Sequence, residues 1–232
     1  MIRFAAALAC LTVLGTGAAV AGVTKAEYLE PTTRYDHAIL GDAVEWGALR
    51  LQDERGQSVL IRLPESRVFE DIAPRIIADS SGETYALVVE TDIAIGARVA
   101  LYNTNGLVDA TPYLGRTHRW SAPVGAADLD GDGNVEIAFV EKPHLAKELK
   151  VWRLKNGKLT FVAGLRGLTN HSIGEDYITS GIRDCGNVKE VITANASWTR
   201  VMATKLRNGK LTSREVGPFH GVKSVQDALR CS

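Results

Sequence analysis

Three features of the sequence together predict an all-β fold: a repeat, alternating apolar runs and hairpin turns. Asn-Gly pairs begin at Asn105, Asn156 and Asn208, at spacings of 51 and 52 residues. Each pair follows an alternating or apolar run and precedes another short extended segment. Asn-Gly between such runs is a strong hairpin signal, because a type I′ turn needs positive φ at both central residues. Four short strands in each of about four such units describe a small β-propeller better than a sandwich.

The position of each hairpin locates the other expected strands. Two short strands should precede it in the second, third and fourth units, over 75–78 and 85–90, 124–127 and 135–141, and 177–182 and 188–194. In the first unit, 35–40 is the best inner strand and 24–29 is its suggested partner. The tail has only a weak helical period, over Lys223–Leu229.

The repeat also sets the expected domain organisation. The units span about 24–67, 68–118, 119–170 and 171–221, and a tail follows over 222–232. Each blade can bury its faces only against its neighbours, so we expect 22–232 to form a single domain.

The first 21 residues have the layout of a secretory signal peptide. Arg3 supplies a short positive start, residues 4–20 are apolar or small, and Ala19-Val20-Ala21 is a small-x-small cleavage pattern. We therefore expect cleavage near Ala21 and a periplasmic or secreted protein. A retained membrane anchor is the alternative, although the stretch is close to the minimum length for a span. No later segment is apolar enough to cross a membrane.

The charge balance argues against some classes of partner, and the cysteine content bears on the cellular compartment. Lys plus Arg and Asp plus Glu number 27 each, so no global field recruits nucleic acid or anionic lipid. Outside the signal only Cys185 and Cys231 remain. In an oxidising compartment an even pair is most simply one disulfide, and two free thiols are the alternative.

Acidic residues recur at alternate positions in the loop that begins at Asp128. Asp128, Asp130, Asp132 and Glu136 occupy positions 1, 3, 5 and 9, and the backbone carbonyl of Asn134 fills position 7. Calcium takes six to eight oxygen ligands, and alternate residues of a tight loop can converge on one point. The loop therefore predicts one bound calcium ion with these five residues as its ligands.

The same loop does not fit an EF-hand. An EF-hand needs a bidentate carboxylate at position 12, where this loop has Phe139, and it needs helices where these flanks read as strands. An ordinary acidic turn is the alternative, but four carboxylates within nine residues repel one another strongly without a cation. The predicted ion would hold the loop, and the motif says nothing about catalysis.

The acidic loop carries a resemblance to a known family. Residues Asp128–Ala138, with the strand and the Asn-Gly hairpin that follow, resemble the FG-GAP/VCBS repeats, calcium-loop β-propellers that include integrin heads and many secreted bacterial proteins. The resemblance implies a propeller with the metal loop between the first two strands of a blade. The full motif occurs once, and the other units match only in layout. Family propellers commonly have seven blades, so four blades leave open a small ring, an open array or an oligomer.

The corresponding loops of the other units lack the full set of calcium ligands. Loop 78–83 of the second unit has too few carboxylates for a tight site. Loop 183–187 of the fourth unit has Cys185 where the third unit has its acidic residues. We infer that a Cys185–Cys231 disulfide pins the C-terminal tail at this corner.

A candidate ligand face is expected at the other end of the units. The loops that enter each blade and those that join its second and third strands should share one face. The candidates there are Arg67, Glu70, Asp71, His118, Arg119, Trp120, His171 and His220. Solvated turn residues and packing caps are the alternative. Three of these histidines recur at spacings of 53 and 49, but nothing in the sequence places their rings within coordination distance of one metal ion.

The favoured function is a binding or interaction module for an unidentified protein, glycan or small molecule. The alternative is a small secreted hydrolase acting on a glycan or peptide, with Glu70, Asp71, Glu175 and Asp176 as candidate carboxylates. The chain has no Gly-x-Ser-x-Gly, no His-Glu-x-x-His and no phosphate-binding glycine loop. The sequence therefore assigns no catalytic residue.

Overall fold

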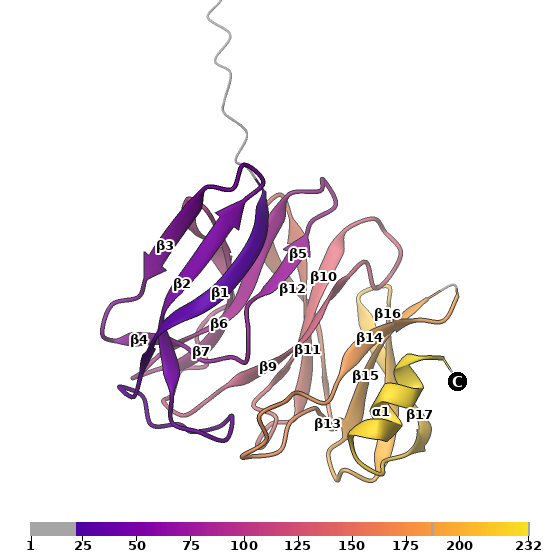
Figure 1. Cartoon of the computed structure of the whole chain (residues 1–232). Helices are drawn as coiled ribbons and strands as arrows, with labels where there is room; N and C mark the ends of the chain where they lie inside the picture. Colours follow the sequence, from indigo (N-terminus) through magenta and orange to yellow (C-terminus); the bar gives the residue numbers. More distant parts are fainter. Residues whose placement is uncertain (1–21, 187, 232) are drawn as a thin grey trace, which may run out of the picture.

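The protein is all-β, as predicted. A computed structural model describes residues 22–186 and 188–231, and this part of the chain contains seventeen strands and one short helix. The predicted signal peptide, over residues 1–21, lies outside the described residues. Three antiparallel sheets stand side by side (Figure 1).

The first sheet has eight strands and contains the first two sequence units. Its main path runs β1-β2-β4-β6-β7-β8, with β3 paired to β2 and β5 paired to β6. The bounds are β1 Val23–Thr32, β2 Glu45–Asp53, β3 Ser58–Arg62, β4 Arg67–Phe69, β5 Arg75–Ala78, β6 Thr84–Asp92, β7 Gly96–Asn103 and β8 Gly106–Ala110.

The second and third sheets correspond to the third and fourth units. The second sheet is a simple meander of β9 Ser121–Ala127, β10 Val135–Glu141, β11 Glu148–Lys155 and β12 Lys158–Arg166. The third has β13 Leu168–Thr169, β14 Gly181–Asp184, β15 Lys189–Asn195, β16 Arg200–Arg207 and β17 Lys210–Pro218, followed by helix α1 Val222–Leu229.

The first unit departs from the expected strand layout. Residues 35–40, predicted as its inner strand, form a loop, and β1 pairs with β2 instead. The short strand β4 then joins the first two units, because it pairs with β2 at Trp46 and with β6 along Arg67–Phe69. The burial of Phe69 and Val68 holds this bridge in place. The strands are therefore grouped into three sheets, and a four-bladed propeller is not shown.

Two of the three predicted Asn-Gly turns have the expected backbone. Asn156 and Asn208 have φ of 51° and 50°, and the glycines that follow both have φ of 68°. In the Asn105-Gly106 pair only the glycine has positive φ. In this hairpin Asn103 pairs with Gly106, so the two-residue loop consists of residues 104 and 105 and begins one residue before the Asn-Gly pair.

The continuous apolar run in β10 places the second sheet between the other two. Ile137 and Phe139 pack with side chains of the first sheet, such as Leu101. The alternate residues Ala138 and Val140 pack on the opposite face, in a cluster that reaches the third sheet. Successive side chains of a strand point to opposite faces, so a strand buried on both faces needs apolar residues throughout.

The C-terminal tail is fastened to the third sheet at two points. A disulfide joins Cys185 to Cys231 with an S–S distance of 2.01 Å, which confirms the predicted pairing and excludes two free thiols. Val225 of α1 is buried against the third sheet, and the Arg183 guanidinium donates to the Ala228 carbonyl at 2.8 Å. The helix in the described tail is far too short to cross a membrane.

Replacing both cysteines, as Cys185→Ser with Cys231→Ser, should lower the free energy of unfolding by about 4 kcal/mol. The bridge closes a loop with a sequence separation of 46 residues, and the chain-entropy relation gives about this value for such a loop. Urea unfolding followed by tryptophan fluorescence measures the change. A reductant should destabilise the original chain similarly and leave the double variant unaffected. Equal stability of the oxidised chain and the double variant would contradict this account.

Candidate functional site

The β9–β10 loop is shaped by its first aspartate. The Asp128 carboxylate accepts hydrogen bonds from the Gly131 N–H at 2.8 Å and the Gly133 N–H at 3.0 Å. Both glycines have positive φ, at 79° and 84°, a conformation that residues with a Cβ rarely adopt. These turns fold the acidic segment back on itself.

Three of the five predicted calcium ligands are brought together by this folding. Asp128, Asp130 and Glu136 each offer a carboxylate oxygen, and these oxygens lie within 4.8 Å of one another. Asp130 Oδ1 is buried without any hydrogen-bond partner, and a buried acceptor left in this way is costly. Asp132 and Asn134 lie outside the cluster, where the N–H and side-chain amide of Asn134 donate to Asp132 Oδ1.

Arg153 on β11 is a member of the site that sequence reasoning missed. Its guanidinium contacts Glu136 at 2.6 Å, Asp130 at 2.6 Å and Asp132 at 2.9 Å. Arg153 lies directly opposite Glu136 in the β10–β11 register. Opposite charges that face each other across a strand pair can indicate such a contact. Arg153 could have been predicted as a partner of Glu136 from the sequence only if the strand register had been known.

The loop keeps an excess of negative charge despite Arg153. The nine residues 128–136 contain four carboxylates, and the Arg153 guanidinium contacts three of them, so the loop and Arg153 together have a formal charge of −3. Glu136 is fully buried, and burial raises its pKa even though the Leu129 N–H and Arg153 donate to it. The residues present therefore fit a site for a hard cation.

The β14–β15 hairpin of the third sheet is equivalent to the β9–β10 loop, but its buried carboxylate is neutralised in a different way. Glu190 on β15 is also buried, but it contacts Arg183 at 2.5 Å, Arg214 at 3.1 Å and Lys205 at 3.6 Å. Burial alone would raise the pKa of Glu190, but hydrogen bonds and charge from Arg183, with help from Arg214 and Lys205, hold it below the ordinary value. This corner carries its own cations and needs no metal ion.

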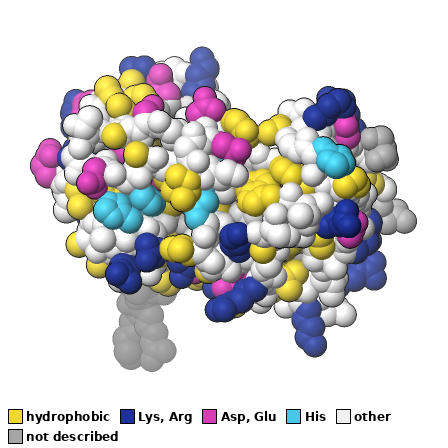
Figure 2. All heavy atoms as spheres, turned by 90° about the horizontal axis from the view of Figure 1, so that it is seen from below, with side chains coloured by type: hydrophobic (Ala, Val, Ile, Leu, Met, Phe, Trp, Pro, Cys, Tyr) yellow, Lys and Arg dark blue, Asp and Glu magenta, His cyan; other side chains and the backbone are white. Residues whose placement is uncertain are grey.

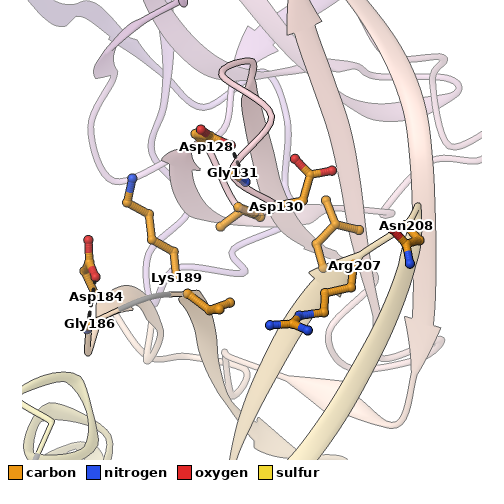
Figure 3. Close-up of a pocket in the computed structure, with 11 residues that line it drawn as sticks. Asp128, Asp130, Gly131, Asp184, Gly186, Lys189, Arg207 and Asn208 are labelled. Carbon is orange, nitrogen blue, oxygen red and sulfur yellow. Dashed lines mark hydrogen bonds between the residues drawn. The ribbon is translucent and has the colours of Figure 1, made fainter.

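The acidic loop forms one wall of a cleft of about 430 Å³ between the second and third sheets (Figure 3). Asp184 and Gly186 come from the β14–β15 hairpin, and Arg207 and Asn208 come from the β16–β17 hairpin. Lys189 extends from the start of β15 toward Asp128. The cleft thus has one acidic wall, and the opposite wall carries the cations Lys189 and Arg207 together with the carboxylate of Asp184.

The predicted ligand-face residues are only partly brought together. His118, Arg119 and Trp120 line one cavity, and the fully buried His171 packs edge-on against Trp120 at 4.9 Å between ring centroids. His220 is exposed and lies beside α1, where its N–H donates to Ser224. Histidine side chains are seen next to hydrophobic ones on the face in Figure 2, and another histidine lies well apart.

The acidic members of the predicted ligand face are not free to meet a substrate. Glu70 and Asp71 are both fully buried, and Asp71 is paired with Arg75 at 2.5 Å. Arg67 is held by Glu90 at 2.8 Å. Burial raises the pKa of Glu70 to about 8, and a hydrogen bond from Thr91 opposes that rise. A glycosidase-like pair of open carboxylates is therefore not formed by these residues.

A scan against protein-family models and a search of the curated proteins both find no match to this chain. The resemblance to FG-GAP/VCBS repeats rests on the acidic loop.

Replacing His144 with Gln should make the protein less sensitive to mild acid. Burial and the charge of a protonated His171 lower the pKa of His144 from 6.5 to about 4. Because the folded state holds this ring neutral, it takes up a proton less readily than the unfolded chain does. This contribution to the free energy of unfolding is therefore largest above about pH 6.5 and decreases as the pH falls toward 4.

The free energy of unfolding should consequently fall less between pH 7 and pH 4.5 in the variant, by about 1 kcal/mol after solvent screening. Chemical denaturation in a chelator, at a series of pH values, measures it. His220→Gln is the matched control, because that histidine is exposed and lies outside the cavity. Parallel pH profiles for the original chain and His144→Gln would refute the prediction.

Proposed function

We propose that this chain is a calcium-binding interaction module of an exported protein. The main support for this proposal is the convergence of three carboxylates in the β9–β10 loop. One of them, Asp130, has a buried oxygen with no hydrogen-bond partner. The disulfide supports an oxidising compartment. The expected signal peptide and the resemblance to FG-GAP/VCBS propellers are parts of the same proposal.

The ligands of the ion would come almost entirely from the loop. Asp128, Asp130 and Glu136 already supply three oxygens, and Asp132 and the carbonyl of Asn134 complete the set that the spacing of the loop residues predicts. Calcium needs six to eight oxygens, so water or an external ligand would fill the remaining positions. When bound, the ion supplies positive charge that the loop otherwise lacks, and Arg153 tethers the loop to β11.

The adjoining cleft favours binding over catalysis. One wall carries the acidic loop, and the other carries Lys189 and Arg207 together with Asp184. Neither cation has an ion-pair partner among the described residues, so both are available to an anionic group of a ligand. The hydrolase alternative is weaker, because Glu70 and Asp71 are buried and cannot contact a substrate directly.

Calcium should raise the melting temperature of the protein compared with a chelator. At ten times the dissociation constant, one bound ion contributes about 1.4 kcal/mol. For a chain of this size that energy corresponds to roughly 3 to 5 °C. Thermal melting followed by circular dichroism measures the shift.

Asp130→Asn should abolish most of this shift, because it removes the carboxylate with the unpartnered oxygen. Asp176→Asn removes an equal charge from an exposed loop elsewhere and should keep the full shift. The proposal fails if the original chain melts at one temperature in calcium and in chelator, or if Asp130→Asn responds like the control.

A further inference from the structure

Four of the five histidines gather at one end of the molecule. His37, His118 and His144 line a cavity of about 260 Å³, and His171 contacts His144 from behind. The rest of the lining is mainly apolar, with Trp120 as its largest buried side chain, and it also includes the cations Arg119 and Lys142. The four residues come from four separate loops, so only the tertiary fold assembles them.

His37 is oriented by the buried carboxyl group of Glu70. Its Nδ1 lies 2.5 Å from Glu70 Oε1, and the other carboxylate oxygen accepts a hydrogen bond from the Thr91 hydroxyl. The Glu70 backbone is also fixed, because its carbonyl accepts the Trp120 indole N–H at 2.8 Å. The second ring nitrogen of His37, Nε2, has no partner among the described residues.

His118 is oriented in the same way by an exposed carboxylate. Its Nε2 lies 2.9 Å from Asp36 Oδ1, and its ring stacks on Tyr35 at 5.3 Å between centroids. The Tyr35 hydroxyl accepts the His118 backbone N–H, which fixes the residue in its left-handed backbone conformation, with φ of 52°. The Nδ1 of His118 has no partner among the described residues.

The spacing of these two rings suits one metal ion. The ring centroids of His37 and His118 are 5.1 Å apart. Two imidazoles bound at about 2.0 to 2.1 Å to one tetrahedral ion place their centroids roughly 5 Å apart. A histidine ligand usually has its other nitrogen on a carboxylate or a carbonyl, and Glu70 and Asp36 provide this support.

Unlike His37 and His118, His144 and His171 are hydrogen-bonded to each other. The His171 Nε2 donates to the Glu175 carbonyl at 2.9 Å, which leaves its Nδ1 as an acceptor for His144 Nε2 at 3.0 Å. This chain of hydrogen bonds already occupies both nitrogens of His171, whose side chain is fully buried. His144 therefore forms part of the cavity wall beside His37 and His118, and His171 supports it from behind.

We propose that His37 and His118 bind a first-row transition-metal ion, such as Zn²⁺ or Cu²⁺, at the mouth of this cavity. Two protein ligands leave the other positions to water or to a donor group of a molecule that enters the cavity. Among the described residues, only the acidic loop holds three ligand atoms within 4.8 Å of one another, so the histidine site is open and not a closed structural site. It is independent of the calcium loop and uses softer nitrogen donors.

The test is calorimetric titration of Zn²⁺ into the full chain near neutral pH, with calcium present to saturate the acidic loop. We expect one zinc ion per chain. His37→Ala and His118→Ala should each weaken binding by about tenfold or more, and the double variant should lose it. His220→Ala is the matched control and should bind as the original chain does, because His220 is exposed and does not line this cavity.

A variant at an exposed position separates loss of zinc binding from loss of folding. Asp36 is exposed, so Asp36→Asn should leave the fold intact and still weaken zinc binding by about 10- to 100-fold, as loss of a supporting carboxylate does. With Cu²⁺, electron paramagnetic resonance should show nitrogen coupling that disappears in the double histidine variant. Asp130→Asn should lose calcium and keep zinc, which separates the two proposals. Absence of zinc binding, or undiminished binding by the double variant, would overturn this one.

Discussion

Each sheet of this protein buries a glutamate on a central strand, and the surrounding charges must compensate for it. Glu90, Glu136 and Glu190 are almost fully buried, on β6, β10 and β15. An unpaired buried carboxylate is expensive, so cations from neighbouring strands are required. Arginines on β4 and β7 contact Glu90, Arg153 contacts Glu136, and three cations contact Glu190. These pairs fix how the strands of each sheet lie against one another.

The same constraint explains why one corner suits a metal ion and its counterpart does not. At the third sheet, arginine and lysine outnumber the carboxylate, and the short hairpin is closed by a disulfide to the tail. At the second sheet, a longer loop adds three aspartates, and one arginine cannot balance them. The third sheet thus balances its buried glutamate with its own cations, whereas the loop of the second sheet keeps unbalanced negative charge. The acidic loop also forms a wall of the cleft between these sheets, so a bound ion would shape that cleft.

Local chemistry made much of this predictable from the sequence. The type I′ turns at Asn156 and Asn208 follow from glycine and asparagine backbone preferences. The apolar run over 135–141 predicts a strand, which is observed as β10, and the cysteine count predicts the disulfide. The convergence of the acidic loop could be predicted because its carboxylates belong to residues that are close together in the chain.

The features that were missed depend on contacts between distant segments. Residues 35–40 alternate like a strand but form a loop, because β1 already occupies the place beside β2. The bridge made by β4 and the position of Arg153 opposite Glu136 need a register that periodicity cannot supply. The cavity likewise gathers His37 and His144 with His118, whereas the recurrence in sequence had pointed to His220.

The central claim is that the β9–β10 loop holds one calcium ion. Equilibrium dialysis against radioactive calcium counts bound ions directly, in the original chain and in Glu136→Gln, which keeps the size of the buried side chain but removes its charge. The account predicts one ion per chain in the original protein and at least a tenfold weaker affinity in the variant. No bound calcium in the folded original chain, or equal affinity in both proteins, would contradict it.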